Sequence, residues 1–543
     1  MLAKAKAVYD LGFASVVPVH SSLFGRPHCF QLFLHGIRTG AVYFCAPDED
    51  QYRDWLAALS GHCDGPGPPA RVLAELGCPQ TPTIASPQLS SSTFLRLKIA
   101  EAKGFNGDGG GGEAYVLLSL NGARIAKTLS KQLGQSLVWD EEFLLHDVKC
   151  RWVELELGLY SRSRGRGDQK LGLLRLASDA GGELDTEGWL PLEDCLPGAS
   201  SGSVRLAAKA SRVLVLPAAE YASLKQALMA EDFAACHHLG SLSRSCGDGS
   251  PEFFARCLLR AFPNLHLILL LSQLRREVAE CDEPRTLFRA PSFATALTSQ
   301  YLALAGSAFV DCLLRPLLPP ILAHRHPLEA KPSLAGEASS DANAAVLCSL
   351  AGSVCDGLYA ALHWLPDSLK RLFAALSSIV ARRWPEEPQL PARAIGMFLF
   401  LRLVCLALVD PRRFQLIQEP VSSAGARNLV LVAKLVQAVG LASLPDDDAP
   451  APIREFQEQQ AQPMAAFLAA LTDWQGEEKE EGDGGRESAE DLAALAAFAS
   501  ANFAKLSAET RALEEMRSLG SVLSLLREHE AQYRQPQQAP AFV

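Results

Sequence analysis

The sequence lacks several of the short patterns on which common functions depend. None of its 14 cysteines forms a Cys-x-x-Cys pair, and no cysteine or histidine spacing typical of a metal site occurs. A phosphate-binding loop with its Lys-Ser/Thr pair and the His-Glu-x-x-His motif are both missing. The glycine-rich residues 107–112 lack that pair and a following helix, so they are interpreted as a flexible loop. These absences argue against a metal site, a P-loop nucleotide site and a disulfide-linked secreted fold.

Long apolar runs and an excess of positive charge are missing as well. The most apolar stretches fall short of the roughly 18 residues that a membrane span needs, and residues 398–409 are interrupted by Arg402. No apolar segment follows Lys4 and Lys6, so no secretory signal is predicted. The net charge of -10, from 51 Lys and Arg against 61 Asp and Glu, argues against a nucleic-acid partner. The sequence therefore predicts a cytoplasmic protein with reduced thiols.

The chain does contain enough apolar sequence to build several folded domains. Apolar residues make up 48% and charged residues 21%, which excludes a disordered or collagen-like chain. A length of 543 residues suggests three or four domains. Residues 1–63 alternate like short strands and close with a helix expected to bury Tyr52, Trp55 and Leu56. Residues 64–93 are rich in Pro, Ser and Gly and are interpreted as a linker.

The rest of the chain changes from strand to helical spacing. Residues 94–192 alternate between Gly-rich turns, which predicts an antiparallel sandwich of about one hundred residues. Residues 220–445 show helical spacing with almost no strand pattern, so an all-α domain is expected. Residues 446–487 are interpreted as an acidic linker region, and residues 488–533 as a helical segment, either free or packed on the α domain. The predicted fold class is multidomain, an all-β N-terminal region followed by an all-α domain and a helical tail.

Two arginines of the helical region call for an explanation. Arg402 lies in residues 398–408, a helix apolar on all sides, where a guanidinium is costly unless carboxylates or carbonyls satisfy its donors. It is either half of a structural ion pair or a support that holds a loop rigid. Arg289 lies just before Pro291, which suits a first helical turn, so we expect Arg289 on a loop at a helix start. A loop arginine is usually only solvated, and a functional role is the alternative.

Three blocks of the helical region resemble the Ras GTPase-activating protein family, in that family's order. The first block is similar to the family's arginine-finger loop, the second to its Phe-Leu-Arg signature and the third to its next helix. The blocks are residues 286–289 with Ala294, Thr295 and Tyr301; residues 400–405 with Asp410, Pro411 and Phe414; and residues 426–427 with 431–434 and Gln437. The resemblance identifies residues 220–445 as a RasGAP domain.

Residues outside this region point to the SynGAP branch of the family. Residues 19–27 resemble the second half of its pleckstrin-homology (PH) domain, and residues 126–128 and 138–143 resemble its C2 domain. The chain is most similar to the Ras protein activator-like members. The resemblance implies a partial PH domain at residues 1–63, which begins late because its first strands are missing, and a C2 domain at residues 94–192.

The family's mechanism implies roles for particular residues. Its arginine finger enters the active site of GTP-bound Ras and neutralises charge on the transferring phosphoryl group, an effect worth roughly 10³–10⁵ in rate for that family. By position, Arg289 is the finger and Arg402 supports the finger loop. Four further residues fall at GTPase-binding positions: Phe288, Arg393, Leu401 and Lys434. The implied protein is not itself an enzyme, and it needs no cofactor of its own because GTP and Mg²⁺ belong to the partner GTPase.

Departures from the family pattern leave a second interpretation open. Leu406 and Leu441 stand where the family usually has proline and asparagine, and Pro291 is unusual so close to the finger. Leu441 and Pro291 favour a catalytically weak scaffold that binds a GTPase or a membrane through its C2 and helical surfaces. Arg289 and Arg402 favour activation. The branch resemblance also implies Rap as a second substrate GTPase and recruitment to the inner face of the plasma membrane.

The C2 region offers few ligands for calcium, which needs six to eight oxygens. Its first loop has Asp108 and Glu113, and its second has only Asp168. Membrane association is therefore predicted to be independent of calcium. Anionic lipid could instead be attracted by Arg162, Arg164 and Arg166. The partial PH domain is interpreted as structural packing rather than a lipid site.

Overall fold

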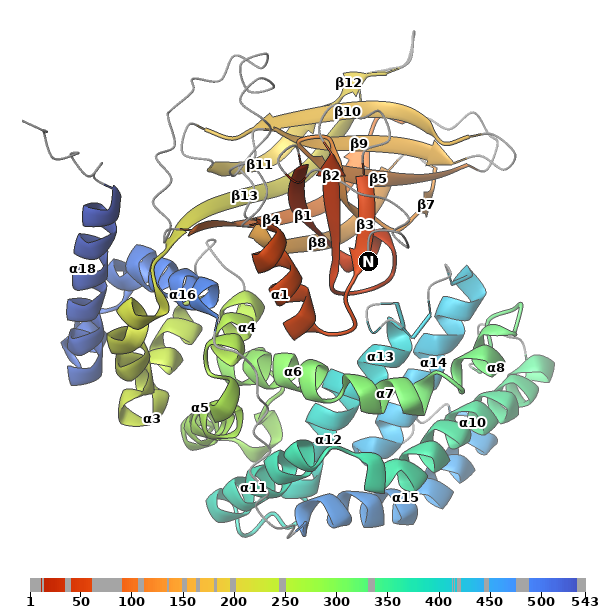
Figure 1. Ribbon diagram of the computed structural model, residues 1–543. Coiled ribbons are helices and arrows are strands. Elements are labelled where there is room, and N and C mark those ends of the chain that lie inside the picture. Colours follow the sequence, from red (N-terminus) through yellow and green to blue (C-terminus); the bar gives the residue numbers. More distant parts are fainter. Residues whose placement is uncertain are drawn as a thin grey trace, which may run out of the picture. The chain divides into compact units, whose positions relative to one another are not determined.

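The computed structural model divides the chain into two compact units, Met1–Glu220 and Tyr221–Val543 (Figure 1). The residues it describes are 11, 14–34, 41–60, 90–105, 112–133, 136–148, 154–162, 167–179, 183–195, 202–243, 251–330, 337–412, 414, 416–417, 421–443, 449–474 and 488–534. The first unit is built from strands, and the second from helices. This all-β region followed by an all-α region is the predicted fold class.

The first unit begins with a small antiparallel sheet in the order β1-β2-β3. Its strands are β1 (Ala14–Val19), β2 (Cys29–Leu34) and β3 (Ala41–Cys45), and helix α1 (Glu49–Ser60) follows. Tyr52, Leu56 and Leu59 form the helix face toward the sheet, at the i, i+4, i+7 spacing of an amphipathic helix. Trp55 lies off this face and is 53% exposed, so the predicted burial of Trp55 is wrong.

A sandwich of two antiparallel sheets follows. One sheet has the order β12-β10-β9-β5-β6, with β7 paired to β5, and the other has the order β11-β13-β4-β8. Its strands are β4 (Ser90–Lys103), β5 (Glu113–Leu120), β6 (Ala123–Lys127), β7 (Lys131–Gln132), β8 (Ser136–Val148), β9 (Glu154–Arg162), β10 (Gln169–Ala177), β11 (Leu184–Pro191), β12 (Glu193–Asp194) and β13 (Ser203–Val215). Strand β13 pairs with both β11 and β4, so the sandwich continues past residue 192 to Val215.

Contacts within the first unit join the small sheet to the sandwich. The His20 N–H donates to the Ile125 carbonyl at 2.8 Å, and the Lys127 N–H donates to Ser22 Oγ at 3.1 Å. The side chain of Val17 is part of the sandwich core. The N-terminal strands therefore pack on the sandwich, as the packing interpretation requires.

The second unit contains no strand among its described residues. Its helices are α3 (Ala222–Ser243), α4 (Pro251–Ala261), α5 (His266–Glu280), α6 (Phe293–Ala305), α7 (Ser307–Leu314), α8 (Leu318–Leu322), α10 (Glu337–Ala360), α11 (Asp367–Arg383), α12 (Leu390–Leu399), α13 (Cys405–Val409), α14 (Ser423–Gly440), α15 (Ala451–Thr472), α16 (Ala489–Asn502), α17 (Ala508–Ala512) and α18 (Glu514–Arg534). Short 3-10 turns join several of them, and a π-helical turn, η8 (Phe400–Val404), joins α12 to α13.

Helix α15 lies inside the range 446–487 that the sequence predicts as an acidic linker. Its 22 residues form one helix, with Pro463 inside it, that contacts α10, α11, α12 and α14. Five apolar side chains of this helix are buried: Phe456, Met464, Phe467, Leu468 and Leu471. Their helical spacing outweighs the acidic composition, so residues 451–472 belong to the folded unit and the linker interpretation is wrong for them.

The C-terminal helices pack on the first helices of the same unit. Helix α16 lies against α4, and α18 lies against α3. Arg260 of α4 and Asp491 of α16 form an ion pair at 2.9 Å, with side chains only 13% and 4% exposed. The helical segment at residues 488–533 is therefore packed on the helical unit rather than free.

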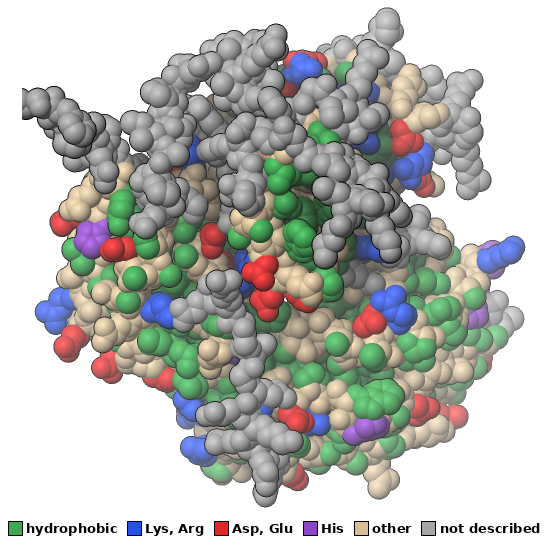
Figure 2. All heavy atoms as spheres, viewed as in Figure 1, with side chains coloured by type: hydrophobic (Ala, Val, Ile, Leu, Met, Phe, Trp, Pro, Cys, Tyr) green, Lys and Arg blue, Asp and Glu red, His purple; other side chains and the backbone are tan. Residues whose placement is uncertain are grey.

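Among the described residues of the second unit, two helices are long and apolar enough, by length and composition alone, to cross a membrane. They are Ser340–Trp364 and Leu390–Val409, and the second contains Arg402. The expectation that no stretch reaches this length is therefore wrong. In Leu390–Val409 the most apolar window is 67% buried inside the unit, so packing accounts for much of its composition. In Ser340–Trp364 the most apolar window is 33% buried. Apolar side chains are also visible at the surface on the face of the molecule shown in Figure 2.

Candidate functional site

The loop that carries Arg289 joins α5 to α6. Helix α5 ends where the Cys281 N–H donates to the Glu277 carbonyl at 3.0 Å, and a 3-10 turn, η6 (Pro284–Thr286), follows. The Arg289 N–H donates to the Thr286 carbonyl at 3.1 Å, which closes a tight turn. Thr286 is itself held because its hydroxyl donates to the Glu283 carbonyl at 2.9 Å. Arg289 thus lies at the end of a hydrogen-bonded turn, on a loop before a helix as predicted.

Phe288 anchors this turn in the helical unit. Its side chain is 3% exposed and packs against Phe398 of α12, with ring centroids 4.9 Å apart. Its backbone has a φ of 56°, in the left-handed region that bulky residues rarely occupy. Such strain persists only where the surroundings hold it, and it often marks a functional site. The ring of Phe288 is buried in the unit, and its GTPase-binding role stays a prediction.

Arg289 is exposed, one residue after the buried Phe288. Among the described residues, its guanidinium has no ion-pair partner. A charged group with no internal partner is free to bind an anionic group supplied from outside. The turn therefore combines a hydrogen-bonded backbone with an exposed cationic side chain.

The far end of the loop is fixed by the start of α6. Ser292 is the N-cap: its Oγ accepts the Thr295 N–H at 3.0 Å, while Thr295 Oγ1 accepts the Ser292 N–H at 2.8 Å. The Ser292 hydroxyl also donates to the carboxylate of Glu277 on α5. The spacing Ser-x-x-Thr resembles a capping box in the sequence, but nothing in the sequence pairs it with Glu277, so this contact was not predicted.

Arg402 lies in the π-helical turn η8 and is half-buried rather than enclosed. Phe400, Leu403 and Val404 of the same turn are buried, whereas Leu401 is half-buried beside Arg402. A π-turn widens the helix and changes which residues face inward, so the apolar composition of residues 398–408 overstates the burial of this arginine. No hydrogen bond or ion pair to the Arg402 side chain occurs among the described residues, so the structural ion-pair interpretation finds no partner there.

Arg393 and Lys434 lie on two helices that approach closely. Arg393 is half-buried on α12, and Lys434 is exposed on α14. At Gly396 an added Cβ would lie 2.7 Å from the Gly440 carbonyl, so the glycine permits the contact between α12 and the end of α14. Leu441 caps α14, and its side chain lies against Gly396. Among the described residues, no hydrogen bond or ion pair joins Lys434 or Arg393 to the loop of Arg289.

The buried thiols of this unit have no nucleophilic character. Burial raises the pKa of Cys355 and of Cys405 to about 12 in each case. Burial also raises the pKa of Cys257, which is fully enclosed. Because the thiolate is the reactive form, these cysteines are core residues, as the sequence predicts.

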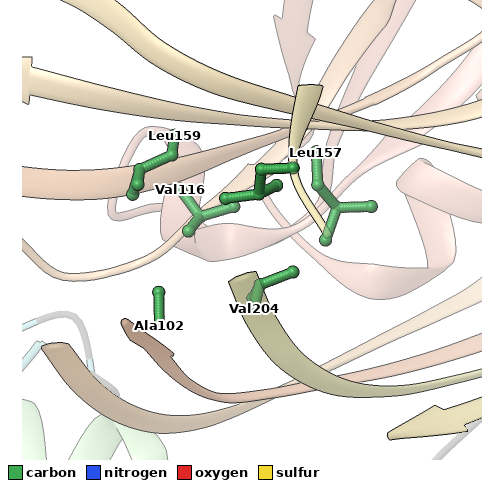
Figure 3. A pocket seen from close by; sticks show the side chains of 6 residues that line it. Ala102, Val116, Leu157, Leu159 and Val204 are labelled. Atoms are coloured by element: carbon green, nitrogen blue, oxygen red, sulfur yellow. The ribbon is translucent and has the colours of Figure 1, made fainter. Parts of the chain in front are cut away.

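The first unit has a small cavity between the two sheets of the sandwich. Its volume is about 10 Å³, and six apolar side chains line it: Ala102, Val116, Leu157, Leu159, Leu192 and Val204 (Figure 3). A space of this size and polarity does not hold a ligand. It is a packing defect of the core.

The carboxylate expected at the second C2 loop is already engaged. Asp168 accepts a hydrogen bond from the Tyr115 hydroxyl at 2.6 Å and from Arg162 Nε at 3.4 Å. The Tyr115 hydroxyl, and then Arg162, hold the pKa of Asp168 below its ordinary value. No cluster of three metal-ligating side chains occurs among the described residues, and Asp108 lies outside them.

Comparison with known proteins gives the helical unit a family. Residues 329–441 match the family described as GTPase-activator protein for Ras-like GTPase, a range that contains Arg393, Leu401, Arg402 and Lys434. Arg289 lies upstream of this range.

Curated relatives match most of this chain. "Ras GTPase-activating protein 1" of Homo sapiens is 30% identical over 466 residues, covering 83% of this chain and 42% of the relative. "RAS protein activator like-3" of Homo sapiens is 26% identical over 433 residues, covering 77% and 39%. The chain thus spans less than half the length of these relatives. The second of these relatives is one of the Ras protein activator-like members that the resemblance points to, and its identity to this chain is the lower of the two.

A solved structure titled "Structure of a C2 domain" aligns with 22% of this chain and 97% of its own length, at 20% identity and a TM-score of 0.18. The family match and the relative that is 30% identical over 83% of this chain show that the chain belongs to the Ras GTPase-activating proteins, with its GTPase-activator domain at residues 329–441.

Proposed function

We propose that this protein activates Ras-type small GTPases by inserting Arg289 into the active site of the GTP-bound partner. The observation that carries the proposal is the exposed Arg289, held by the buried Phe288 in a unit that contains a RasGAP domain. The guanidinium stabilises charge that develops on the transferring phosphoryl group, and the partner supplies GTP and Mg²⁺. Rap-type GTPases are proposed as a second substrate class.

The decisive experiment is single-turnover GTP hydrolysis by Ras and Rap proteins with the wild-type chain and the Arg289→Ala variant. The finger acts in the transition state, so its loss should lower the stimulated rate by about 10³-fold or more. Affinity for the GTP-bound partner should change little, because the finger contributes less to the ground state. Phosphate release measures the stimulated rate, and fluorescence titration measures the affinity.

Arg285→Ala is the matched control, because Arg285 is an exposed arginine of the same loop. It removes an equal charge but not the finger, so stimulation should persist. Equal stimulation by Arg289→Ala and wild type would rule out the assignment of Arg289. Tight binding of the GTPase by wild type with no stimulation would favour the scaffold function instead.

We also propose that the protein acts in the cytoplasm at the inner face of the plasma membrane, with the sandwich contacting anionic lipid. Arg162 is partly neutralised by Asp168, so this contact depends more on Arg164 and Arg166, which lie outside the described residues. Salt should weaken it, because attraction between exposed charges is screened.

A further inference from the structure

We infer that Glu277 and Ser292 are positioning residues for Arg289, and that the hydrogen bond between them sets the stimulated rate rather than the affinity for the GTPase. The inference rests on the proposed function, because it assigns the positioning of the same finger. It concerns two side chains that neither the sequence motifs nor the comparisons single out.

Glu277 holds both ends of the finger loop. Its backbone carbonyl accepts the N–H of Cys281, where the loop begins. Its side-chain carboxylate accepts the hydroxyl of Ser292, where the loop ends. A single residue of α5 thus contacts both ends of a twelve-residue segment, Cys281–Ser292. Loss of the carboxylate contact would release the Ser292 end of the loop, while the backbone hydrogen bond at the Cys281 end remains.

Ser292 transmits this closure to α6. Its oxygen accepts a hydrogen bond from the Thr295 N–H, and its O–H donates one to the Glu277 carboxylate. The hydroxyl therefore uses its donor and one acceptor site at the same time. The first turn of α6 is therefore oriented by the last turn of α5. Arg289 lies three residues before this junction, and its side chain has no ion-pair partner among the residues described. Its place in space consequently depends on the backbone at Phe288 and at Ser292.

The position of the finger matters more for the rate than for binding. A displacement of about 1 Å can lower a reaction rate about 100-fold when the group acts only in the transition state. Glu277 and Ser292 are both half-buried, so water can replace the lost hydrogen bond and the fold can persist. The contact is therefore expected to affect geometry at the loop without deciding whether the unit folds.

The test uses the full chain with GTP-loaded Ras. Ser292→Ala and Glu277→Ala should each lower the saturating single-turnover rate by about 10- to 100-fold, with the dissociation constant unchanged. Ser292→Thr keeps the hydroxyl and Glu277→Gln keeps an acceptor oxygen, so both should restore most of the rate. The Ser292→Ala/Glu277→Ala double variant should lose less than the product of the two single losses, because the two substitutions remove one shared contact.

Ser488→Ala is the matched control. Ser488 is the N-cap of α16, and its side chain accepts the Asp491 N–H, so the variant removes a comparable helix cap away from the finger loop. Its stimulated rate should equal that of wild type. A wild-type rate in Ser292→Ala, failure of both conservative variants, or an equal loss in Ser488→Ala would overturn the inference. If Arg289→Ala also stimulates normally, the proposed function fails and the inference fails with it, a pattern distinct from failure of the pair alone.

Discussion

At the scale of single residues, Phe288 and Arg289 show how one backbone angle separates two neighbouring side chains. The left-handed conformation of Phe288 lets its ring enter the unit while the next side chain stays exposed. Burial of a phenylalanine side chain contributes roughly 1.5–3 kcal/mol, which is enough to offset the cost of about 1–2 kcal/mol for a left-handed residue. The strain is thus offset by the packing that it permits.

Arg402 is a second residue whose environment predicts a measurable outcome. It is half-buried, and its side chain has no polar partner in the described part of the chain. Arg402→Leu should therefore change the free energy of unfolding by less than about 1 kcal/mol. If Arg402 supports the finger loop when Ras docks, the stimulated rate should fall although the fold is intact. Urea denaturation and the single-turnover assay test the two parts, and full activity in Arg402→Leu would refute the support role.

At the scale of elements, three helices of the second unit meet at a pair of histidines on α3. His237 Nε2 lies 3.3 Å from Glu280 Oε1 of α5, and His238 Nε2 lies 3.9 Å from Glu515 Oε1 of α18. Burial lowers the pKa of each histidine below its ordinary value, although Glu280 and Glu515 oppose this effect. The positive charge of Arg276 on α5 also lowers the pKa of both histidines. Both histidines are therefore neutral in the folded protein near neutral pH.

This arrangement predicts that acid weakens the junction. Between the lowered pKa values and the ordinary value of 6.5, the unfolded chain binds protons that the folded chain does not. Stability should consequently fall as pH falls through this window. Urea midpoints measured above and below the window should differ less for a His237→Gln/His238→Gln variant than for wild type. Parallel pH profiles for the two proteins would contradict the prediction.

In the sandwich, the contacts of Asp168 predict that calcium does not change membrane binding. Asp168 is occupied by Tyr115 and Arg162, so a cation there would have to displace a 2.6 Å hydrogen bond and an arginine. Sedimentation of the chain with anionic vesicles should give the same bound fraction with calcium and with chelator. Tyr115→Phe removes the hydroxyl that donates to Asp168, so this variant is the control in which the Asp168 carboxylate is more available to calcium. Binding that appears only with calcium would overturn this expectation.

How far the sequence predicts these elements depends on whether a local pattern decides them. Alternation and helical spacing predict the strands and helices, and Pro291 places Arg289 before a helix. The positive φ of Phe288, the π-turn around Arg402 and the contact from Glu277 to Ser292 arise from tertiary packing, which no local pattern encodes. In residues 446–487, the acidic residues that follow α15 mask its helical spacing, so the sequence favours a linker there.

At the scale of the whole molecule, the second unit is closed by a buried ion pair. Arg260 and Asp491 are 231 positions apart in sequence and join α4 to α16. Asp491→Ala would leave the Arg260 guanidinium enclosed without this partner, at a cost of about 3–5 kcal/mol. Chemical denaturation should show that loss in the transition of the second unit while the sandwich transition is unchanged. The exposed pair Arg315–Asp311 is the control, since Asp311→Ala should cost less than about 1 kcal/mol.

The same closure has a consequence for synthesis on the ribosome. Helices α3 and α4 emerge early, but the helices that cover them, α16 and α18, are made only after the intervening part of the unit. At roughly 5–20 residues per second, the 231 positions between Arg260 and Asp491 take about 12–46 seconds to translate. During that interval the apolar sides of α3 and α4 are without their final cover. The nascent chain therefore passes through a long stage in which chaperones can bind it, and premature termination after α15 would leave those sides permanently exposed.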